Sequence, residues 1–141
     1  MRSATVRAMP TLFWDIETRS VVSLETAGEW RYAADPTTDV LCVGYAVDDN
    51  NPLIWTPGDP IPEAFTTAAA DSSWRVVAHN YAFERAISTR VLEPRYGWPR
   101  IPITQQRCSM TWSWSMHCRA DWTRPSRRSV SRCRRTPKVT S

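Results

Sequence analysis

The chain is 141 residues long with a formal net charge of +4, a length that fits one compact domain of roughly 100 to 150 residues. Residues 1–107 carry 10 Lys and Arg against 13 Asp and Glu, whereas residues 108–141 carry 8 against 1. No apolar run approaches the roughly 18 residues that span a membrane, and residues 1–10 lack the apolar stretch of a secretory signal. We therefore expect a cytoplasmic protein with an acidic body, a basic tail and no membrane partner.

The first half of the chain predicts three strands. Residues 10–18, PTLFWDIET, place apolar and aromatic side chains next to two acids. This pattern indicates a strand with acidic side chains near its end. The nearly continuous apolar run at 40–47 predicts a second strand. A turn sequence, Asp-Asp-Asn-Asn-Pro, then leads to a short run at 53–55, which predicts a third strand, antiparallel to the second.

Two helices and one more strand are predicted after that hairpin. A starting proline and several alanines indicate a helix over 62–70, and WRVVA at 74–78 indicates a buried strand. A helix follows over about 81–92, with apolar residues at i, i+4 and i+8, and Pro94 and Gly97 are expected to end it. This order of elements predicts an α/β fold in which helices pack on a mixed sheet.

Two acids at the end of the first predicted strand are candidate metal ligands. Successive side chains of a strand point to opposite faces, so Asp15 and Glu17 project from the same face. Neighbouring carboxylates repel each other unless a cation joins them, and hard oxygen ligands suit Mg²⁺ or Mn²⁺. The pair therefore predicts a metal site, although the same pattern is common at solvated strand ends.

A second candidate segment, AHNYAFER, lies where the fourth predicted strand meets the last predicted helix. Asn80 is a suitable helix N-cap, and Phe83 fits a place in the core. These structural roles explain most of the segment. Glu84 is less readily explained, because it lies one turn into the helix beside apolar neighbours.

Together, FWDIETRS and VVAHNYAFERAI resemble the first and second exonuclease motifs of the DnaQ-like family, especially its branch in phage-type, family A-like DNA polymerases. The resemblance covers about residues 10–110. It implies a ribonuclease H-like mixed sheet with flanking helices and 3′→5′ hydrolysis of single-stranded DNA ends. It further implies two Mg²⁺ or Mn²⁺ ions as cofactors and a covalently linked polymerase domain as the usual partner.

The resemblance also implies roles for individual residues. Asp15 would bridge both metal ions, Glu17 would hold the ion on the side of the attacking water, and Glu84 would be the third ligand. The wider family usually has Asp at that third position, so the extra methylene of Glu84 leaves its coordination open. Asn80 would support the second motif by hydrogen bonding, and Phe83 would pack near the terminal nucleotide.

The family's third motif, a Tyr or His followed several residues later by Asp, has no convincing counterpart after residue 100. His117 and Asp121 have a similar spacing, but they come too soon after Glu84 and lie in a segment without an apolar helical face. We therefore expect residues 1–110 to be an exonuclease domain that is incomplete at its C-terminus and inactive as this chain.

Residues 111–141 form a basic tail of unusual composition. No Leu, Ile, Phe, Tyr or Gly occurs after Cys108, whereas residues 108–141 hold seven Arg and seven Ser. Such a segment buries too little apolar surface to offset its ordering entropy, so we expect it to be disordered. A shifted reading frame is one explanation, because permissible codons for 116–133 also encode an amphipathic helical sequence of the kind that family members have there.

Two other functions are compatible with the sequence. A non-catalytic nucleic-acid-binding protein would use the basic segment from Arg124 to Lys138 to hold phosphates by charge, and the acids of the body would then be incidental. A resolvase-like or transposase-like nuclease of the ribonuclease H-like group would share the metal site. Mg²⁺ or Mn²⁺ binding that depends on the acids of the body is expected for the exonuclease and for the resolvase-like nuclease. It is not expected for the non-catalytic nucleic-acid-binding protein.

Overall fold

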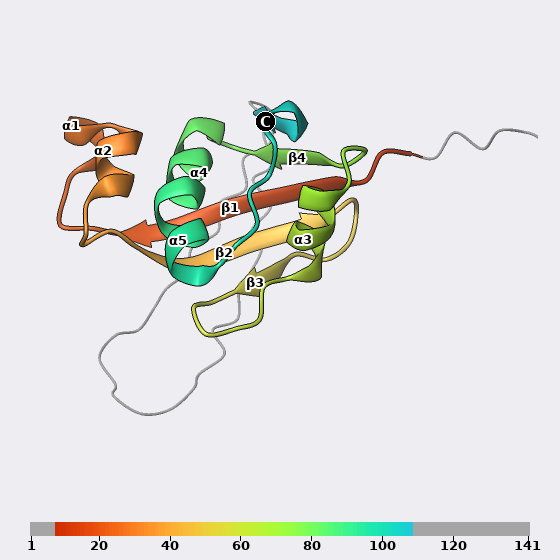
Figure 1. The fold of residues 1–141 in the computed structure, drawn as a ribbon, viewed down its shortest axis with the longest axis horizontal. Coiled ribbons are helices and arrows are strands. Elements are labelled where there is room, and N and C mark those ends of the chain that lie inside the picture. Colours follow the sequence, from red (N-terminus) through yellow and green to blue (C-terminus); the bar gives the residue numbers. More distant parts are fainter. Residues whose placement is uncertain (1–7, 109–141) are drawn as a thin grey trace, which may run out of the picture.

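The computed structural model describes residues 8–108, which form a five-stranded mixed sheet with helices packed on it (Figure 1). In spatial order the strands are β3 Leu53–Trp55, β2 Asp39–Val47, β1 Thr11–Arg19, β4 Arg75–Ala78 and β5 Gln106–Cys108. The β1–β2 and β2–β3 pairs are antiparallel, whereas the β1–β4 and β4–β5 pairs are parallel. The predicted α/β fold and the predicted antiparallel hairpin are confirmed.

The helices lie between the strands in the chain and cover one face of the sheet. They are α1 Leu24–Ala27, α2 Glu29–Ala34, α3 Glu63–Ala70, α4 Tyr81–Ile87 and α5 Glu93–Tyr96, with a π-helical turn, Ser88–Leu92, that joins α4 to α5. Figure 1 shows α3 and the continuous α4–α5 helix in front of the sheet, and α1 and α2 beyond the end of β1. None of the helices within 8–108 is long and apolar enough to cross a membrane.

The α4–α5 helix extends further than the sequence predicts. Pro94 was expected to end it, but the helix continues to Tyr96 and ends at Gly97, whose φ of 70° is left-handed. A proline lacks an N–H and crowds the preceding turn. The π-helical turn directly before α5 widens the helix at that point. The predicted end of the helix at about Leu92 is therefore too early, because the helix continues through Pro94, whereas the predicted stop at Gly97 is confirmed.

The core lies between the sheet and the helices. Leu12, Trp14 and Ile16 of β1 are buried on the helix-covered face, and Phe13, Asp15 and Glu17 alternate with them. The ring of Trp14 is 5.4 Å from that of Phe65, and Phe65 is 4.6 Å from Trp98, measured between centroids. These contacts fix α3 and the segment after α5 against β1, so the backbone that carries Asp15 is rigidly held.

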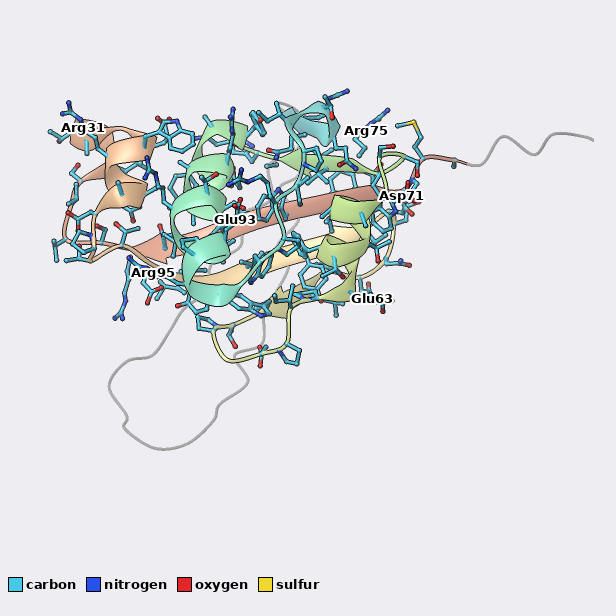
Figure 2. The ribbon with its side chains drawn as sticks, in the orientation of Figure 1. Arg31, Glu63, Asp71, Arg75, Glu93 and Arg95 are labelled. Atoms are coloured by element: carbon cyan, nitrogen blue, oxygen red, sulfur yellow. The ribbon has the colours of Figure 1, made fainter. Side chains whose placement is uncertain are left out.

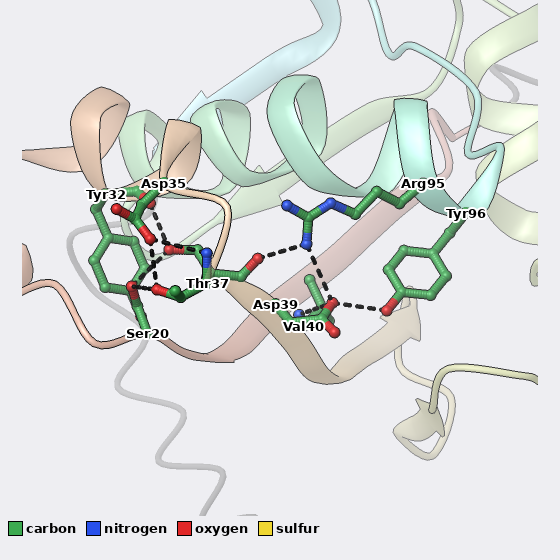
Figure 3. Close-up of polar contacts among 9 residues, drawn as sticks. Ser20, Tyr32, Asp35, Thr37, Asp39, Val40, Arg95 and Tyr96 are labelled. Carbon is green, nitrogen blue, oxygen red and sulfur yellow. Dashed lines mark hydrogen bonds and ion pairs between the residues drawn. The ribbon is translucent and has the colours of Figure 1, made fainter.

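A polar network ties the end of the α4–α5 helix to the start of β2 (Figure 3). The Tyr96 hydroxyl donates a hydrogen bond of 2.7 Å to the Asp39 carboxylate, and Arg95 donates one of 2.7 Å to the backbone carbonyl of Thr38. The buried Thr38 hydroxyl in turn donates to the carbonyl of Tyr32 in α2 at 2.6 Å. The network therefore fixes the α4–α5 helix, whose first turn contains Glu84, relative to the start of β2 and to α2.

One buried side chain joins α3, β4 and β5. Gln105 is 5% exposed, and its Nε2 donates to the carbonyls of Ala68 at 2.9 Å and Asp71 at 2.7 Å, with a longer contact of 3.3 Å to Trp74. Two of these carbonyls belong to the last turn of α3 and its C-cap, where the helix itself offers no donor. Gln105 therefore supplies the C-terminal hydrogen bonds that α3 lacks.

Replacing Gln105 by alanine should lower the free energy of unfolding by about 2 kcal/mol, because it leaves buried carbonyls without donors. Urea unfolding followed by tryptophan fluorescence measures the loss. The matched control is Thr104→Ala at the exposed neighbouring position, which should change the value by less than about 0.5 kcal/mol. Equal effects of the two substitutions would show that Gln105 does not stabilise α3.

Candidate active site

Asp15 and Glu84 come together at the edge of β1. The parallel partner strand β4 ends at Ala78, which pairs with Trp14, so the next residues of β1 have no strand on that side. The chain turns there into α4, and Glu84 lies in its first turn. The side chains of Asp15 and Glu84 are hydrogen-bonded to each other. The structure thus joins one residue from each of the two sequence motifs.

The Glu84 carboxyl group is deeply buried. Only 2% of the residue is exposed, and within the described residues its Oε2 has no hydrogen-bond partner. Burial raises the pKa of Glu84 to about 8, and the nearby Asp15 charge adds to the rise. Hydrogen bonds from the backbone N–H groups of Glu84 itself and of Ile16 oppose it. At neutral pH, in the absence of a cation, Glu84 therefore carries a proton.

The Asp15 carboxyl group is less buried and has the more polar surroundings. Burial raises its pKa above the ordinary value, whereas the hydrogen bond from Glu84, the charge of His79 and the Ile16 N–H lower it. The two acids thus lie in a position where a cation would interact with both. Carboxylate oxygens, one of them buried and without a partner, are a suitable donor set for Mg²⁺ or Mn²⁺.

Glu17 lies two residues further along β1 and is half-buried. The pairing of β1 with β2 is regular through Glu17, which is opposite Cys42, and shifts by a bulge before Thr18. Among residues 8–108, no three His, Cys, Asp or Glu side chains form a ready-made metal-binding group. The structure therefore unites Asp15 with Glu84 but does not add Glu17 to a preformed three-ligand site.

The two predicted substrate-binding residues flank this pair. Asn80 is the N-cap residue of α4, as predicted, but its side chain makes no capping hydrogen bond; its backbone carbonyl accepts from Phe83 and Glu84 instead. Phe83 is half-buried, and its ring lies 6.1 Å from that of Tyr32, so the structure gives it a packing role. Their contacts with DNA stay predictions.

Two contributors to the site were not predicted as such. His79 lies between β4 and α4, and its charge acts on Asp15. The Ile16 N–H hydrogen-bonds to both carboxyl groups. His79 lies within the second motif, which was a usable signal. The direction of the Ile16 N–H depends on where β4 ends, and no sequence pattern indicates that.

Several predictions concern residues outside the described range of 8–108. They are the disorder of the tail, the shifted reading frame, and the weak third-motif match of His117 and Asp121. The described residues end with β5, which pairs with β4 through Cys108. The candidate metal ligands within the described residues are therefore Asp15, Glu17 and Glu84.

Comparison with known proteins finds a similarity over part of the chain. The chain is 38% identical over 79 residues to a DNA polymerase of Bacillus phage SP02. The match covers 55% of this chain but only 12% of that polymerase, so the chain spans a small part of its relative's length. No family model matches the chain, and no solved structure matches it. The predicted relationship to a phage DNA polymerase is thereby supported beyond the two motifs.

Proposed function

We propose that this chain is part of the 3′→5′ exonuclease domain of a phage-type DNA polymerase, with a ribonuclease H-like fold and DNA 3′ ends as its substrate. The observation that carries the proposal is the hydrogen-bonded pair of Asp15 and Glu84 at the edge of β1. The similarity to a phage DNA polymerase supports the same reading. A polymerase domain on the same chain would be the usual partner.

Asp15 and Glu84 would be the principal metal ligands, and Glu17 would join them from the same face of β1. Two divalent ions bound there would activate the attacking water and stabilise the leaving oxygen. The protein's own contribution is orientation: the Ile16 N–H and the buried first turn of α4 hold the Glu84 carboxyl group in place. Phe83 and Asn80 lie close in sequence to Glu84 and would contact the terminal nucleotide.

Manganese binding tests the proposal. Mn²⁺ added to the 141-residue chain should broaden the backbone amide signal of Ile16 strongly, because this N–H interacts with both carboxyl groups. Affinity should rise from pH 6 to pH 9, since the ion displaces the proton held by Glu84. Asp15→Asn should weaken binding at least about tenfold, a loss of about 1.4 kcal/mol.

Glu63→Gln is the matched control, because Glu63 is an exposed acid on α3 (Figure 2) and its removal changes the net charge equally. This variant should bind Mn²⁺ as the unmodified chain does. Absence of binding, or binding that Asp15→Asn leaves unchanged, would contradict the proposal and favour a non-catalytic nucleic-acid-binding protein.

A further inference from the structure

A pocket of about 180 Å³ lies on the helix-covered face of the sheet. Its polar walls include Arg85, Ser88 and Thr89 from the α4–α5 helix and Arg100 from the segment that follows it. Figure 1 shows that segment returning beside the helix toward β4. Trp14 also lines the pocket, whereas Asp15, the next residue of β1, belongs to the opposite set of side chains. Neither Asp15 nor Glu84 lines the pocket.

The pocket offers hydrogen-bond donors that the described part of the fold does not use. The Arg85 guanidinium lies 5.9 Å from the centre of the Trp30 ring and makes no ion pair with any described residue. A guanidinium stacked on a ring keeps the N–H groups at its edge available for an anion. The hydroxyls of Ser88 and Thr89 likewise have no hydrogen bond within the described residues, and both belong to the π-helical turn.

The charges around the pocket favour an anion. Arg100 is neutralised, because its Nε and Nη2 both lie 3.0 Å from the Glu93 carboxylate. Figure 2 labels Glu93 on this helix. Arg85 therefore remains as one uncompensated positive charge among the charged groups that line the pocket. A phosphate group, which accepts hydrogen bonds through several oxygens, suits a guanidinium combined with two hydroxyls.

The volume of the pocket and the side chains at its rim restrict the class of ligand further. A volume of 180 Å³ lies below the roughly 300 Å³ at which pockets for whole drug-sized ligands begin. It fits a phosphate with part of a sugar. The rim carries two exposed apolar side chains, Trp30 at 43% and Ile103 at 55%, and an aromatic ring is a suitable surface for a nucleobase.

We propose that this pocket binds the phosphate group of a nucleotide, with the nucleoside against the Trp30 and Ile103 rim. The proposal goes beyond the nuclease function and needs no metal ion. The phosphate belongs either to a free nucleotide or to the 5′ end of a DNA strand, since both present the same dianionic group.

Isothermal titration calorimetry in EDTA tests the proposal, because EDTA removes metal-dependent binding at Asp15 and Glu84. The probes are inorganic phosphate, a nucleoside 5′-monophosphate and a short single strand with a 5′ phosphate. We expect the monophosphate to bind several-fold more tightly than phosphate. Arg85→Gln should weaken monophosphate binding about tenfold, as expected for the loss of charge-assisted hydrogen bonds, and Thr89→Val should weaken it a few-fold.

Arg90→Gln is the matched control, because Arg90 is exposed on the same helix and does not line the pocket. It should bind like the unmodified chain. Tighter binding of the strand than of the monophosphate assigns the ligand to DNA, and equal binding assigns it to a free nucleotide.

Two results would overturn the proposal. One is the absence of binding of phosphate and monophosphate at millimolar concentration. The other is equal binding by the unmodified chain and by Arg85→Gln. Circular dichroism verifies that each variant is folded, and Arg85→Lys, which keeps the charge but loses the planar fork, should bind with intermediate affinity if Arg85 is a ligand.

Discussion

Replacing Glu84 by glutamine should raise the free energy of unfolding at pH 9 and leave it nearly unchanged at pH 5. The pKa of Glu84 is about 8 in the folded chain, against an ordinary value of 4.5. Between these two values the folded chain holds a proton that the unfolded chain has lost, so the stability of the unmodified protein falls as the pH rises. Glutamine keeps the neutral shape at every pH, and the variant escapes this loss.

The size of the effect follows from the pKa difference. One pKa unit corresponds to about 1.4 kcal/mol, and the residue is buried, so solvent screening is small. We expect Glu84→Gln to be more stable than the unmodified chain by at least about 2 kcal/mol at pH 9. Urea unfolding at pH 5, 7 and 9 in EDTA measures the difference, with Glu63→Gln as the exposed control whose effect should not depend on pH.

Mn²⁺ should reverse the order of stability of the unmodified chain and the Glu84→Gln variant at pH 9. A ligand that binds only the folded state stabilises it in proportion to the logarithm of its concentration, so Mn²⁺ at pH 9 should stabilise the unmodified chain and not the Glu84→Gln variant. Mn²⁺ that stabilises both equally would show that Glu84 is not a ligand. A gap between the two proteins that closes as the pH rises would show that Glu84 is ionised in the folded chain.

The expected effects of pH and of Mn²⁺ on stability both follow from the position of Asp15 and Glu84. A buried carboxyl group next to a second acid costs free energy when both are ionised, and only a proton or a cation relieves that cost. Glu84 is buried to 2% exposure, and its second oxygen has no described partner. A glutamine would therefore serve the fold better.

The sequence predicted the sheet well, because its strands have clear apolar patterns. The predicted strand at 10–18 corresponds to β1 Thr11–Arg19, and that at 40–47 corresponds to β2 Asp39–Val47. The alternation in β1 correctly placed Asp15 apart from the buried Trp14 and Ile16. Strand burial is a local property of residue type, so it can be read from single residues and their neighbours.

The helices α1 and α2 and the strand β5 were not predicted. The helices have only four and six residues, too few to show an apolar period, and β5 has only three. Gly28, with a φ of 78°, separates the two helices by a left-handed residue. Such short elements form because the rest of the domain holds their ends in place, as the Thr38 and Gln105 hydrogen bonds do.

The candidate site was only partly predictable. The resemblance to known motifs brought Asp15 and Glu84 together, since no periodicity relates residues on a strand and a distant helix. The burial of Glu84 and the role of the Ile16 N–H depend on the early end of β4 at Ala78. These are properties of strand length and helix placement, which arise from packing of the whole domain.

The 141-residue chain should degrade single-stranded DNA from its 3′ end slowly or not at all. Within residues 8–108 no three-ligand group is preformed. The sequence after residue 100 also holds no convincing counterpart of the third motif that the resemblance implies. An incomplete carboxylate set keeps weak affinity for one ion and loses the clamp on the attacking and leaving oxygens. Release of nucleotides from a 5′-labelled single strand with Mg²⁺ or Mn²⁺ measures this activity.

A longer protein in which the reading frame after Cys108 supplies a Tyr or His and an Asp should recover hydrolysis. In that protein, Asp15→Ala should reduce the rate roughly a thousandfold or more, since it removes the ligand expected to bridge both ions. The fold should survive, because Asp15 is only partly buried and lies outside the buried set of β1 side chains. Glu63→Gln should leave the rate unchanged.

Strong metal-dependent activity from the 141-residue chain, lost on Asp15→Ala, would instead mean that a residue after Cys108 completes the site, with His117 and Asp121 the first to test.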